Sequence, residues 1–296
     1  MYTYFYLLVF IPGLLLNATA LWVLCRHIRK NTKAAIFMIN LALADLVHIL
    51  SLPLRIYYYF THVWPFGQGV CLFCFYLKYL NMYAAIAFLV CISIQRCVFL
   101  LRPFAARQWR RRYDLLISIT VWVVVSLGCS PFILMRSSSP SPSSSSNSTN
   151  VCFAELPMRD ILPAAGALLI AAELLGFVIP LVLVLACSCL TAGSLRGETA
   201  GAVPDQGEKR RALRMVLSCA MVFLLCFAPY HVTMPLDFMV KANILSDCSI
   251  RDLIQRSHPV TLCLASLNSS LDPLMYYFTT DEFRRRLSKA ELADTF

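Results

Sequence analysis

Long apolar runs alternate with short polar segments along the whole chain. Seven such runs can be delimited, each long enough as a helix to cross a hydrocarbon core of about 30 Å. They cover residues 2–25, 34–60, 71–101, 115–135, 161–195, 212–240 and 253–278. Because a backbone surrounded by lipid must satisfy its own hydrogen bonds, each run is expected to be helical. The pattern predicts an all-α membrane protein, with a seven-transmembrane helix bundle over residues 1–280.

A short basic segment follows the last run. Phe283 and Leu287 are four residues apart, on one face of a helix, and three consecutive arginines at 284–286 stand between them. One apolar face beside a basic one is typical of helices that lie in the membrane interface. We therefore expect a short interfacial helix after the seventh span, followed by a short cytoplasmic tail, within residues 281–296.

Composition supports a membrane protein and bears on whether the chain binds nucleic acid or membrane lipids. The chain is 59% hydrophobic and only 14% charged, whereas soluble domains carry about 25% charged residues. The net charge of +10 is compatible with nucleic-acid binding. However, the charges lie between the apolar runs, which is the pattern of membrane proteins. Membrane lipids, and not nucleic acid, are the expected contacts.

The basic residues are unevenly divided between the two sides. Of the 26 Lys and Arg residues, 18 fall in one set of connecting segments and five in the other, while Arg55, Lys78 and Arg96 lie within runs. The positive-inside rule predicts an extracellular amino terminus and a cytoplasmic carboxyl terminus, as expected for a multi-pass protein of the plasma membrane. Asn147 begins an Asn-Ser-Thr glycosylation signal in the outer Ser/Pro-rich segment 136–150.

Polar residues inside the runs are candidates for function. An aspartate such as Asp45 is costly within a membrane and normally faces partners in the bundle. Its candidate neighbours are Asn17, Asn81, Asn268 and Asp272. Two carboxylates in one cluster would share a proton or a cation.

Several motifs occur in a fixed order along the chain. They are Asn17; Leu41 to Asp45; Trp64 to Gly67 before Cys71; Arg96; Trp122; Pro180; Cys226 to Pro229; and Asp272 to Tyr276. Together they resemble the rhodopsin-like (class A) G-protein-coupled receptors over almost the whole chain. The resemblance implies a receptor that activates heterotrimeric G proteins and binds arrestin. Its activation switch would be Arg96, Phe227, Pro229, Pro273 and Tyr276, with the prolines as kinks that enlarge small movements.

The resemblance also implies a disulfide and, in many members, an ion. Cys71 and Cys152 match the cysteines that join the second outer loop to the third span. The cluster of Asp45, Asn81, Asn268 and Asp272 often holds sodium in the family. Here Ala85 stands where a hydroxyl ligand is usual, so a sodium site and a hydrogen-bonded cluster without an ion both stay open. We expect no other cofactor or metal.

The sequence around Arg96, at the inner end of the third span, departs from the family pattern. Arg96 matches the arginine of the family's Asp-Arg-Tyr step, but its neighbours are Gln95 and Cys97. The usual salt bridge to the neighbouring acid cannot form. We expect a weaker restraint on the inactive state and some basal activity.

Longer stretches narrow the ligand by resemblance. The sequences WPFGQGVCLFCFYLKYLNMY, SLPLRIYYYF, FAPYH and LCLASLNSSLDPLMYYF resemble the purinergic-receptor-like branch, and within it most of all the lysophosphatidylserine receptors. The implied ligand is an extracellular lysophospholipid. Its phosphoserine head group would meet Arg55, Tyr79, Arg136 and Lys241, with Tyr76 and His258 nearby and Phe177 along the acyl chain.

Physical reasoning reaches the same chemistry less sharply. Arg55 is ten residues beyond Asp45, about 15 Å nearer the outside, and a buried guanidinium fork suits phosphate. Lys78 points about 100° away from Tyr79 and is therefore left out of the predicted site. Arg136 and Lys241 can instead extend to the surface. Glu173 and Asp237 can either receive a ligand amine or pair with these cations and reduce their availability.

Other functions remain as alternatives. A nucleotide receptor of the same fold presents phosphate to the same cations. A transporter is a weaker alternative, because repeated halves and interrupted helices are not evident. The chain has no metal-spaced His/Cys cluster or nucleophile motif, so we do not expect an enzyme.

Overall fold

The computed structural model describes residues 2–28, 35–137, 152, 162–196, 206–245 and 247–279. Their regular structure is entirely helical, with no strand among them. The helices are α1 (Tyr2–Val23), η1 (Leu24–Ile28), α2 (Ala35–Thr61), α3 (Gly67–Leu101), α4 (Pro103–Gln108), α5 (Arg111–Ser137), α6 (Leu162–Glu173), η3 (Leu174–Val178), α7 (Ile179–Arg196), α8 (Gln206–Val222), η4 (Phe223–Phe227), α9 (Ala228–Lys241) and α10 (Cys248–Thr279). These helices overlap all seven expected spans, and the predicted all-α fold class is confirmed.

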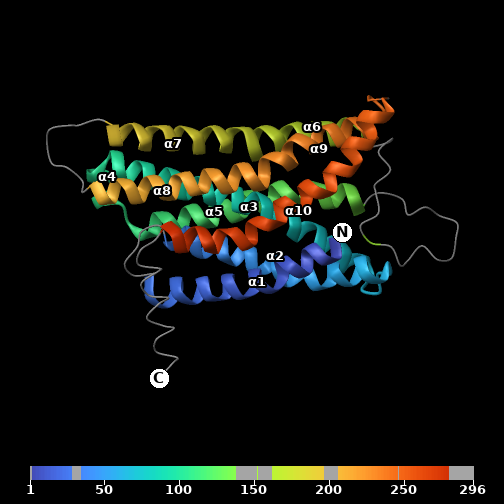
Figure 1. Cartoon of the computed structure of the whole chain (residues 1–296), viewed down its shortest axis with the longest axis horizontal. Helices are drawn as coiled ribbons and strands as arrows, with labels where there is room; N and C mark the ends of the chain where they lie inside the picture. Colours follow the sequence, from blue (N-terminus) through green and yellow to red (C-terminus); the bar gives the residue numbers. More distant parts are fainter. Residues whose placement is uncertain are drawn as a thin grey trace, which may run out of the picture.

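The helices form one bundle along the long axis of the molecule (Figure 1). The segments α6, η3 and α7 follow one another as a continuous rod, as do α8, η4 and α9. Helix α3 is central, because it packs against α2, α5, α7 and α8. A helix in contact with so many others can report a change on one side of the bundle to the other.

Six of the helical rods in the described part of the chain are long and apolar enough to cross a membrane. Helix α10 is long as well, with 32 residues, but it is more polar. Asn268, Ser269 and Asp272 of α10 are each 0% exposed. Its polar side chains therefore face the bundle and not lipid, which lowers its overall hydropathy without preventing it from serving as the seventh span.

Two rods contain a short π-helical turn next to a proline. In η4, the N–H of Ala228 donates to the carbonyl of Phe223, five residues earlier, just before Pro229. In η3, Ile179 donates to Leu174 in the same way, just before Pro180. Proline lacks an N–H, and the wider π turn accommodates the interrupted ladder.

The start of α3 is anchored by a compact turn. Gly67 has a φ of +79°, which favours glycine, and its carbonyl accepts a 2.7 Å hydrogen bond from Trp64 Nε1. Trp64 is buried with Cys71, Cys74 and Cys152. Cys71 and Cys152 form the predicted disulfide, with their Cα atoms 5.8 Å apart. We call this end of the bundle the disulfide end and the opposite one the Arg96 end.

Some predictions fall outside the described residues. These are the interfacial helix after the seventh span and the glycosylation site at Asn147. The backbone of Arg136 lies in the last turn of α5, but its side chain is not among those described.

Candidate ligand-binding site

Arg55 is the central residue of the predicted head-group site. It follows Pro53 on α2 and is only 2% exposed, although arginine is rarely buried. Its Nη2 donates to the backbone carbonyl of Cys74 on α3. The guanidinium therefore lies between α2 and α3, near the disulfide end.

Two further basic side chains lie close to Arg55. Lys78 on α3 and His48 on α2 both interact electrostatically with Arg55 and with each other. His48 is 2% exposed, and neither of its ring nitrogens has a hydrogen-bond partner in the described part of the chain. Arg55 and Lys78 are the two cations of this group, and their mutual repulsion at low dielectric creates a positive region. An anionic ligand would relieve that repulsion.

Lys78, which sequence analysis left out of the predicted site, therefore lies next to its central residue. Its ammonium does not point away from Tyr79, because Nζ lies over the Tyr79 ring, 5.8 Å from the ring centroid. Lys78 is four residues after Cys74 and seven after Cys71 on one helical face, and both cysteines are buried. That spacing is the signal that could have included Lys78 from the sequence.

The predicted tyrosines of α3 have different partners. Tyr79 shares a side-chain hydrogen bond with Tyr230 of α9. Tyr76 instead donates to the carbonyl of Ser126 on α5, at 3.2 Å. Tyr79 therefore faces the side of the bundle where α9 and α10 meet, whereas Tyr76 ties α3 to α5.

His258 lies beyond Tyr230 on α10. Its Nδ1 is 3.3 Å from Thr233 Oγ1, and the ring centroids of Tyr230 and His258 are 5.7 Å apart. Thr233 is also 2.8 Å from Thr261 Oγ1. These polar contacts hold α9 against α10 next to the Tyr79 hydroxyl.

An acid–histidine pair, which sequence analysis did not identify, lies between α6 and α9. Glu173 Oε1 is 3.1 Å from His231 Nδ1, and His231 is 2% exposed. Phe177 stacks on the His231 ring with a centroid distance of 4.5 Å and on Phe223 at 5.6 Å. Phe177 thus holds the histidine against the core.

Lys241 at the end of α9 has an acidic partner. Its Nζ is 2.8 Å from Asp237 Oδ2, one helical turn earlier. This is the pairing that sequence analysis left open for Asp237. Any ligand anion at Lys241 would therefore meet the aspartate as well, so Lys241 offers less net positive charge than the Arg55–Lys78 region.

Of the expected neighbours of Asp45, Asn81, Asn268 and Asp272 meet it at mid-depth, whereas Asn17 donates to the carbonyls of Gly13 and Ser269. Asn81 Nδ2 donates to Asp45 Oδ1 at 3.0 Å, and Asn268 Nδ2 lies 3.5 Å from the same oxygen. Asp45 and Asp272 are both 0% exposed and interact directly. Among the described residues, Asp45 Oδ2 and both Asp272 oxygens have no hydrogen-bond partner. The donor set fits one unit of positive charge, either a shared proton or a monovalent cation, while Ala85 supplies no ligand oxygen.

At the Arg96 end, Gln95 makes a contact that the sequence did not reveal. Its Nε2 donates to Asp114 Oδ1 of α5 at 2.8 Å, and Trp109 Nε1 donates to the same oxygen at 2.7 Å. Asp114 is 1% exposed. The residue in the place of the family's acid therefore fastens α3 to α5. Arg96 itself lies towards α8, within electrostatic reach of Cys219.

The predicted switch residues of α10 and η4 lie deep in the bundle. Tyr276 is 0% exposed, and its hydroxyl donates to the Met38 carbonyl of α2 at 3.3 Å. Phe227 is also 0% exposed and packs edge-on against Phe223. Pro229 follows the π turn of η4, and Pro273 lies within α10 beside Asp272. A movement of α10 would therefore disturb the contact of Tyr276 with α2, and a movement of η4 would disturb the packing of Phe227.

Comparison with known proteins agrees with this geometry. The family model described as the seven-transmembrane receptors of the rhodopsin family matches residues 16–276. A seven-helix bundle with a buried polar core and this match place the chain in the rhodopsin family of receptors, which are multi-pass membrane proteins. It is thus a class A G-protein-coupled receptor, as its sequence resemblance predicts.

Three relatives narrow the branch. The human protein named "Probable G-protein coupled receptor 174" is 51% identical over 295 residues, covering 99% of this chain and 87% of that protein. The human "Putative P2Y purinoceptor 10" is 51% identical over 290 residues, covering 98% and 84%. The mouse lysophosphatidic acid receptor 4 is 34% identical over 281 residues, covering 95% and 74%. Receptors named for nucleotides and for lysophospholipids are therefore both among its relatives.

Proposed function

We propose that this receptor responds to an extracellular lysophospholipid, with lysophosphatidylserine as the first candidate. The observation that carries the proposal is the meeting of Arg55 and Lys78 between α2 and α3. Clustered cations in a low-dielectric bundle favour a ligand with phosphate or carboxylate groups. The sequence resemblance to lysophosphatidylserine receptors, and a lysophosphatidic acid receptor among the relatives, support the lipid.

The head group would lie between the two sides of the bundle. Its phosphate would meet Arg55 and Lys78, and its carboxylate or amine would reach the Lys241–Asp237 pair. Tyr79 is hydrogen-bonded to Tyr230 of α9, and its ring centroid lies 5.8 Å from Lys78 Nζ. A ligand that displaces or strengthens this bond would act on α9, which continues through η4 into α8.

The signal would pass by population shift. A ligand that binds one arrangement of the bundle more tightly increases its population. In the proposed active arrangement, α8 moves away from Arg96 and opens a crevice for a heterotrimeric G protein, with arrestin as a second partner of the same end. This assigns the disulfide end to the outside and the Arg96 end to the cytoplasm.

The buried carboxylate pair would set the balance between the two arrangements. We infer that Asp45 and Asp272 share a proton or a sodium ion in the inactive receptor. Its single positive charge would offset the repulsion between them. Movement of α10 against α2 would change their separation, and so the affinity for that charge.

A nucleotide is the second candidate. It would present phosphates to the same cations, and the P2Y purinoceptor relative at 51% identity favours keeping it. The two ligands differ in whether an acyl chain must be housed.

The test is a signalling assay in cells that express the whole chain. Lysophosphatidylserine, lysophosphatidic acid and a panel of nucleoside diphosphates would be compared on the native receptor and on Arg55→Ala. Arg256→Ala is the matched control, because Arg256 lies at the same end but is exposed and paired with Asp252. Surface expression is measured for each.

We expect a response to lysophosphatidylserine that Arg55→Ala weakens and Arg256→Ala preserves. Loss of one charge-assisted contact costs about 1.5–3 kcal/mol, which is about a 10- to 100-fold rise in the half-maximal concentration. A response to nucleotides alone would contradict the lipid but keep the receptor. An unchanged response in Arg55→Ala would contradict the head-group site.

A further inference from the structure

Two buried cysteines meet between α3 and α7, one position after Arg96 on α3. The thiols of Cys97 and Cys187 share a side-chain hydrogen bond. Both are free cysteines, 4% and 8% exposed, and they pack with Val216 of α8 in one cluster. Neither the head-group site nor the predicted activation switch uses these thiols. Their meeting across two helices is therefore a separate feature of the bundle.

Two other cysteines of this region have different surroundings. Cys189 is two residues after Cys187, about 200° around α7, and its side chain is exposed. Cys219 of α8 donates to Met275 Sδ of α10 at 3.6 Å. Cys97 and Cys187 therefore form a pair of their own, and Cys189 offers a matched control on the same helix.

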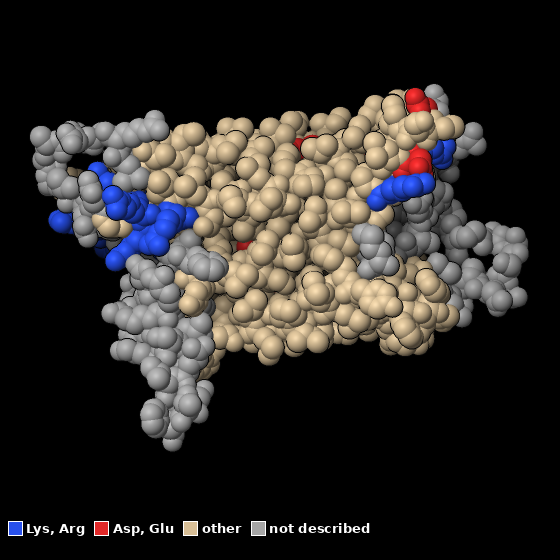
Figure 2. Space-filling model, viewed as in Figure 1, with Lys and Arg blue, Asp and Glu red and all other residues tan. Residues whose placement is uncertain are grey.

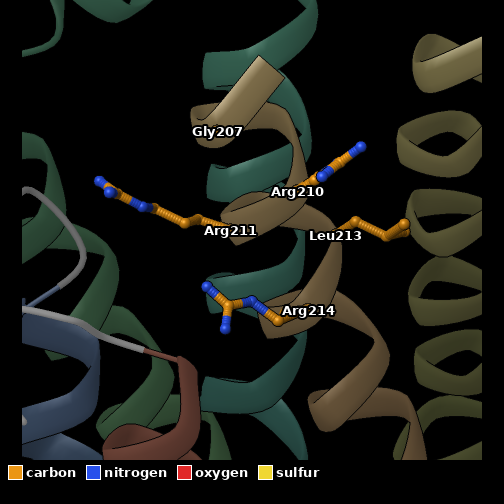
Figure 3. Close-up of a pocket in the computed structure, with 5 residues that line it drawn as sticks. All are labelled: Gly207, Arg210, Arg211, Leu213 and Arg214. Atoms are coloured by element: carbon orange, nitrogen blue, oxygen red, sulfur yellow. The ribbon is translucent and has the colours of Figure 1, made fainter. Parts of the chain in front are cut away.

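Helix α8 lies between the thiol pair and a hollow at the surface. The hollow measures about 510 Å³ and is lined by Gly207, Arg210, Arg211, Leu213 and Arg214 (Figure 3). In Figure 3, Leu213 extends to the opposite side of α8 from Arg211 and Arg214. Val216 follows Leu213 by three residues, so the two share a face of α8. The thiol pair is therefore about one helical turn beyond the hollow.

The pair lies near the aqueous border of the bundle. Figure 2 shows a cluster of Lys and Arg residues at this end of the molecule, next to a broad uncharged surface. Charged residues of membrane proteins gather where the apolar belt meets water, so small polar oxidants and reductants reach this end. In the proposed orientation it faces the cytoplasm, where disulfides are transient and serve redox sensing.

We propose that Cys97 and Cys187 form a reversible disulfide that joins α3 to α7 beside Arg96. Hydrogen peroxide is the oxidant: its O–O bond breaks, one oxygen binds the first sulfur, and the other leaves as water. The second thiol attacks the resulting sulfenic acid, the S–S bond forms, and a second water leaves. Two electrons pass from the two sulfurs to peroxide. A reducing thiol such as glutathione returns them by thiol–disulfide exchange.

The geometry favours the second of these steps. Thiols in hydrogen-bond contact need only a small side-chain movement to form an S–S bond of about 2 Å. Because the second thiol is held beside the sulfenic acid, the intramolecular reaction outpaces further oxidation. The first step should be slow, since both sulfurs are buried against Val216. Displacement of Val216 should therefore control the rate.

The disulfide would fix the turn of α3 that carries Arg96 against α7. Its effect on signalling rests on the proposed function, in which α8 moves away from Arg96 to open the G-protein crevice. That movement would also take Val216 away from the thiols. The active receptor should therefore be oxidised faster than the resting one, and the new bond should reduce its activation of the G protein.

The test uses the purified whole chain, with one receptor in each nanodisc and no ligand. After treatment with hydrogen peroxide, the remaining thiols are blocked, and peptides are analysed by mass spectrometry without reduction. The Cys71–Cys152 disulfide is the internal reference. Cys187→Ala is compared with the matched control Cys189→Ala, which removes an exposed thiol from the same helix. Cys97→Ala keeps the test decisive if Cys187→Ala is unstable.

We expect a peptide that joins Cys97 to Cys187 in the native chain and in Cys189→Ala, but not in Cys187→Ala or Cys97→Ala. Glutathione should remove the cross-link. Val216→Ala should speed its formation about 10-fold, because the loss of two buried carbon atoms makes uncovering easier. Val222→Ala is the matched truncation of a buried valine elsewhere on α8, and it should not.

The same samples report on signalling. Activation of a purified G protein by lysophosphatidylserine should fall in proportion to the cross-linked fraction and return with glutathione. Cys187→Ala should make activation insensitive to peroxide, whereas Cys189→Ala should stay as sensitive as the native chain. A chain that forms the disulfide but does not respond to the lipid would contradict the proposed function and still support the thiol pair.

Four results would overturn the proposal. Absence of the cross-linked peptide in both the native chain and Val216→Ala would exclude the disulfide. A cross-link that persists in Cys187→Ala and disappears in Cys189→Ala would assign it to the exposed thiol. Equal acceleration by both valine variants would show general loosening of α8 and contradict the covering role of Val216. Unchanged G-protein activation in the cross-linked receptor would refute its effect on signalling.

Discussion

The bond between Gln95 and Asp114 can be tested by a charge substitution. Gln95→Glu places a carboxylate beside Arg96, as in the Asp-Arg-Tyr step that this part of the sequence resembles. In this chain, however, it would place two carboxylates 2.8 Å apart, where Gln95 Nε2 now meets Asp114 Oδ1. Asp114 is 1% exposed, so the repulsion would be poorly screened.

The expected cost follows from that distance. Two unit charges 2.8 Å apart repel by about 6 kcal/mol at an effective dielectric constant of about 20. Side-chain movement would relieve part of this, but the lost charge-assisted hydrogen bond still costs about 1.5–3 kcal/mol. At about 2–4 °C per kcal/mol, the apparent melting temperature should fall by roughly 3 °C or more.

The compensating change is Asp114→Asn in the same molecule. The asparagine amide can donate to the new carboxylate, while its oxygen still accepts from Trp109 Nε1. Thermal unfolding of the purified receptor would be compared for the native chain, the single Gln95→Glu variant and the double variant. Recovery of most of the lost stability is expected. A single variant as stable as the native chain, or a double variant no better than the single one, would refute this account of α3 and α5.

Three further substitutions test other parts of the structure. Lys78→Gln should raise the half-maximal ligand concentration about 10-fold in the signalling assay, because it removes half of the Arg55–Lys78 charge; an unchanged value would contradict its place in the site. Gly176→Ala would put a methyl carbon 2.5 Å from the Tyr83 ring, so overpacking of about 1–3 kcal/mol should lower the melting temperature; normal stability would show that η3 yields. Asp272→Asn should abolish any difference in agonist affinity between sodium and choline buffers, since it removes half of the charge that would hold the ion; a sodium effect that persists would exclude the carboxylate pair as its source.

The membrane spans were the feature that the sequence predicted best. Apolar runs of sufficient length must be helical in lipid, because each helix satisfies its own backbone hydrogen bonds. The runs from Cys71 to Leu101 and from 34 to 60 therefore lie within α3 and α2 to within a few residues. Even the less apolar α10 was recognisable, because Asp272 and Pro273 belong to an ordered motif.

The residues of the candidate ligand-binding site could be predicted from the sequence only in part. Arg55 could be predicted, because a buried arginine near the outer end of a span requires a functional reason. The contact of Lys78 with Arg55 was missed because sequence analysis used only the angle of about 100° between Lys78 and Tyr79 on α3. That angle does not show which of the two side chains faces the bundle. The bond of Gln95 to Asp114 gave no signal, since the two residues are 19 positions apart and belong to different helices.

Sequence by itself therefore determined the number, order and approximate limits of the spans, together with the family. These depend on local hydropathy and on motifs read within single helices. Only the tertiary structure decided that Lys78 joins Arg55, that Glu173 meets His231 and that Gln95 binds Asp114. Such pairs depend on the rotation and depth of every helix against its neighbours. Those positions result from packing across the whole bundle, which no single segment encodes.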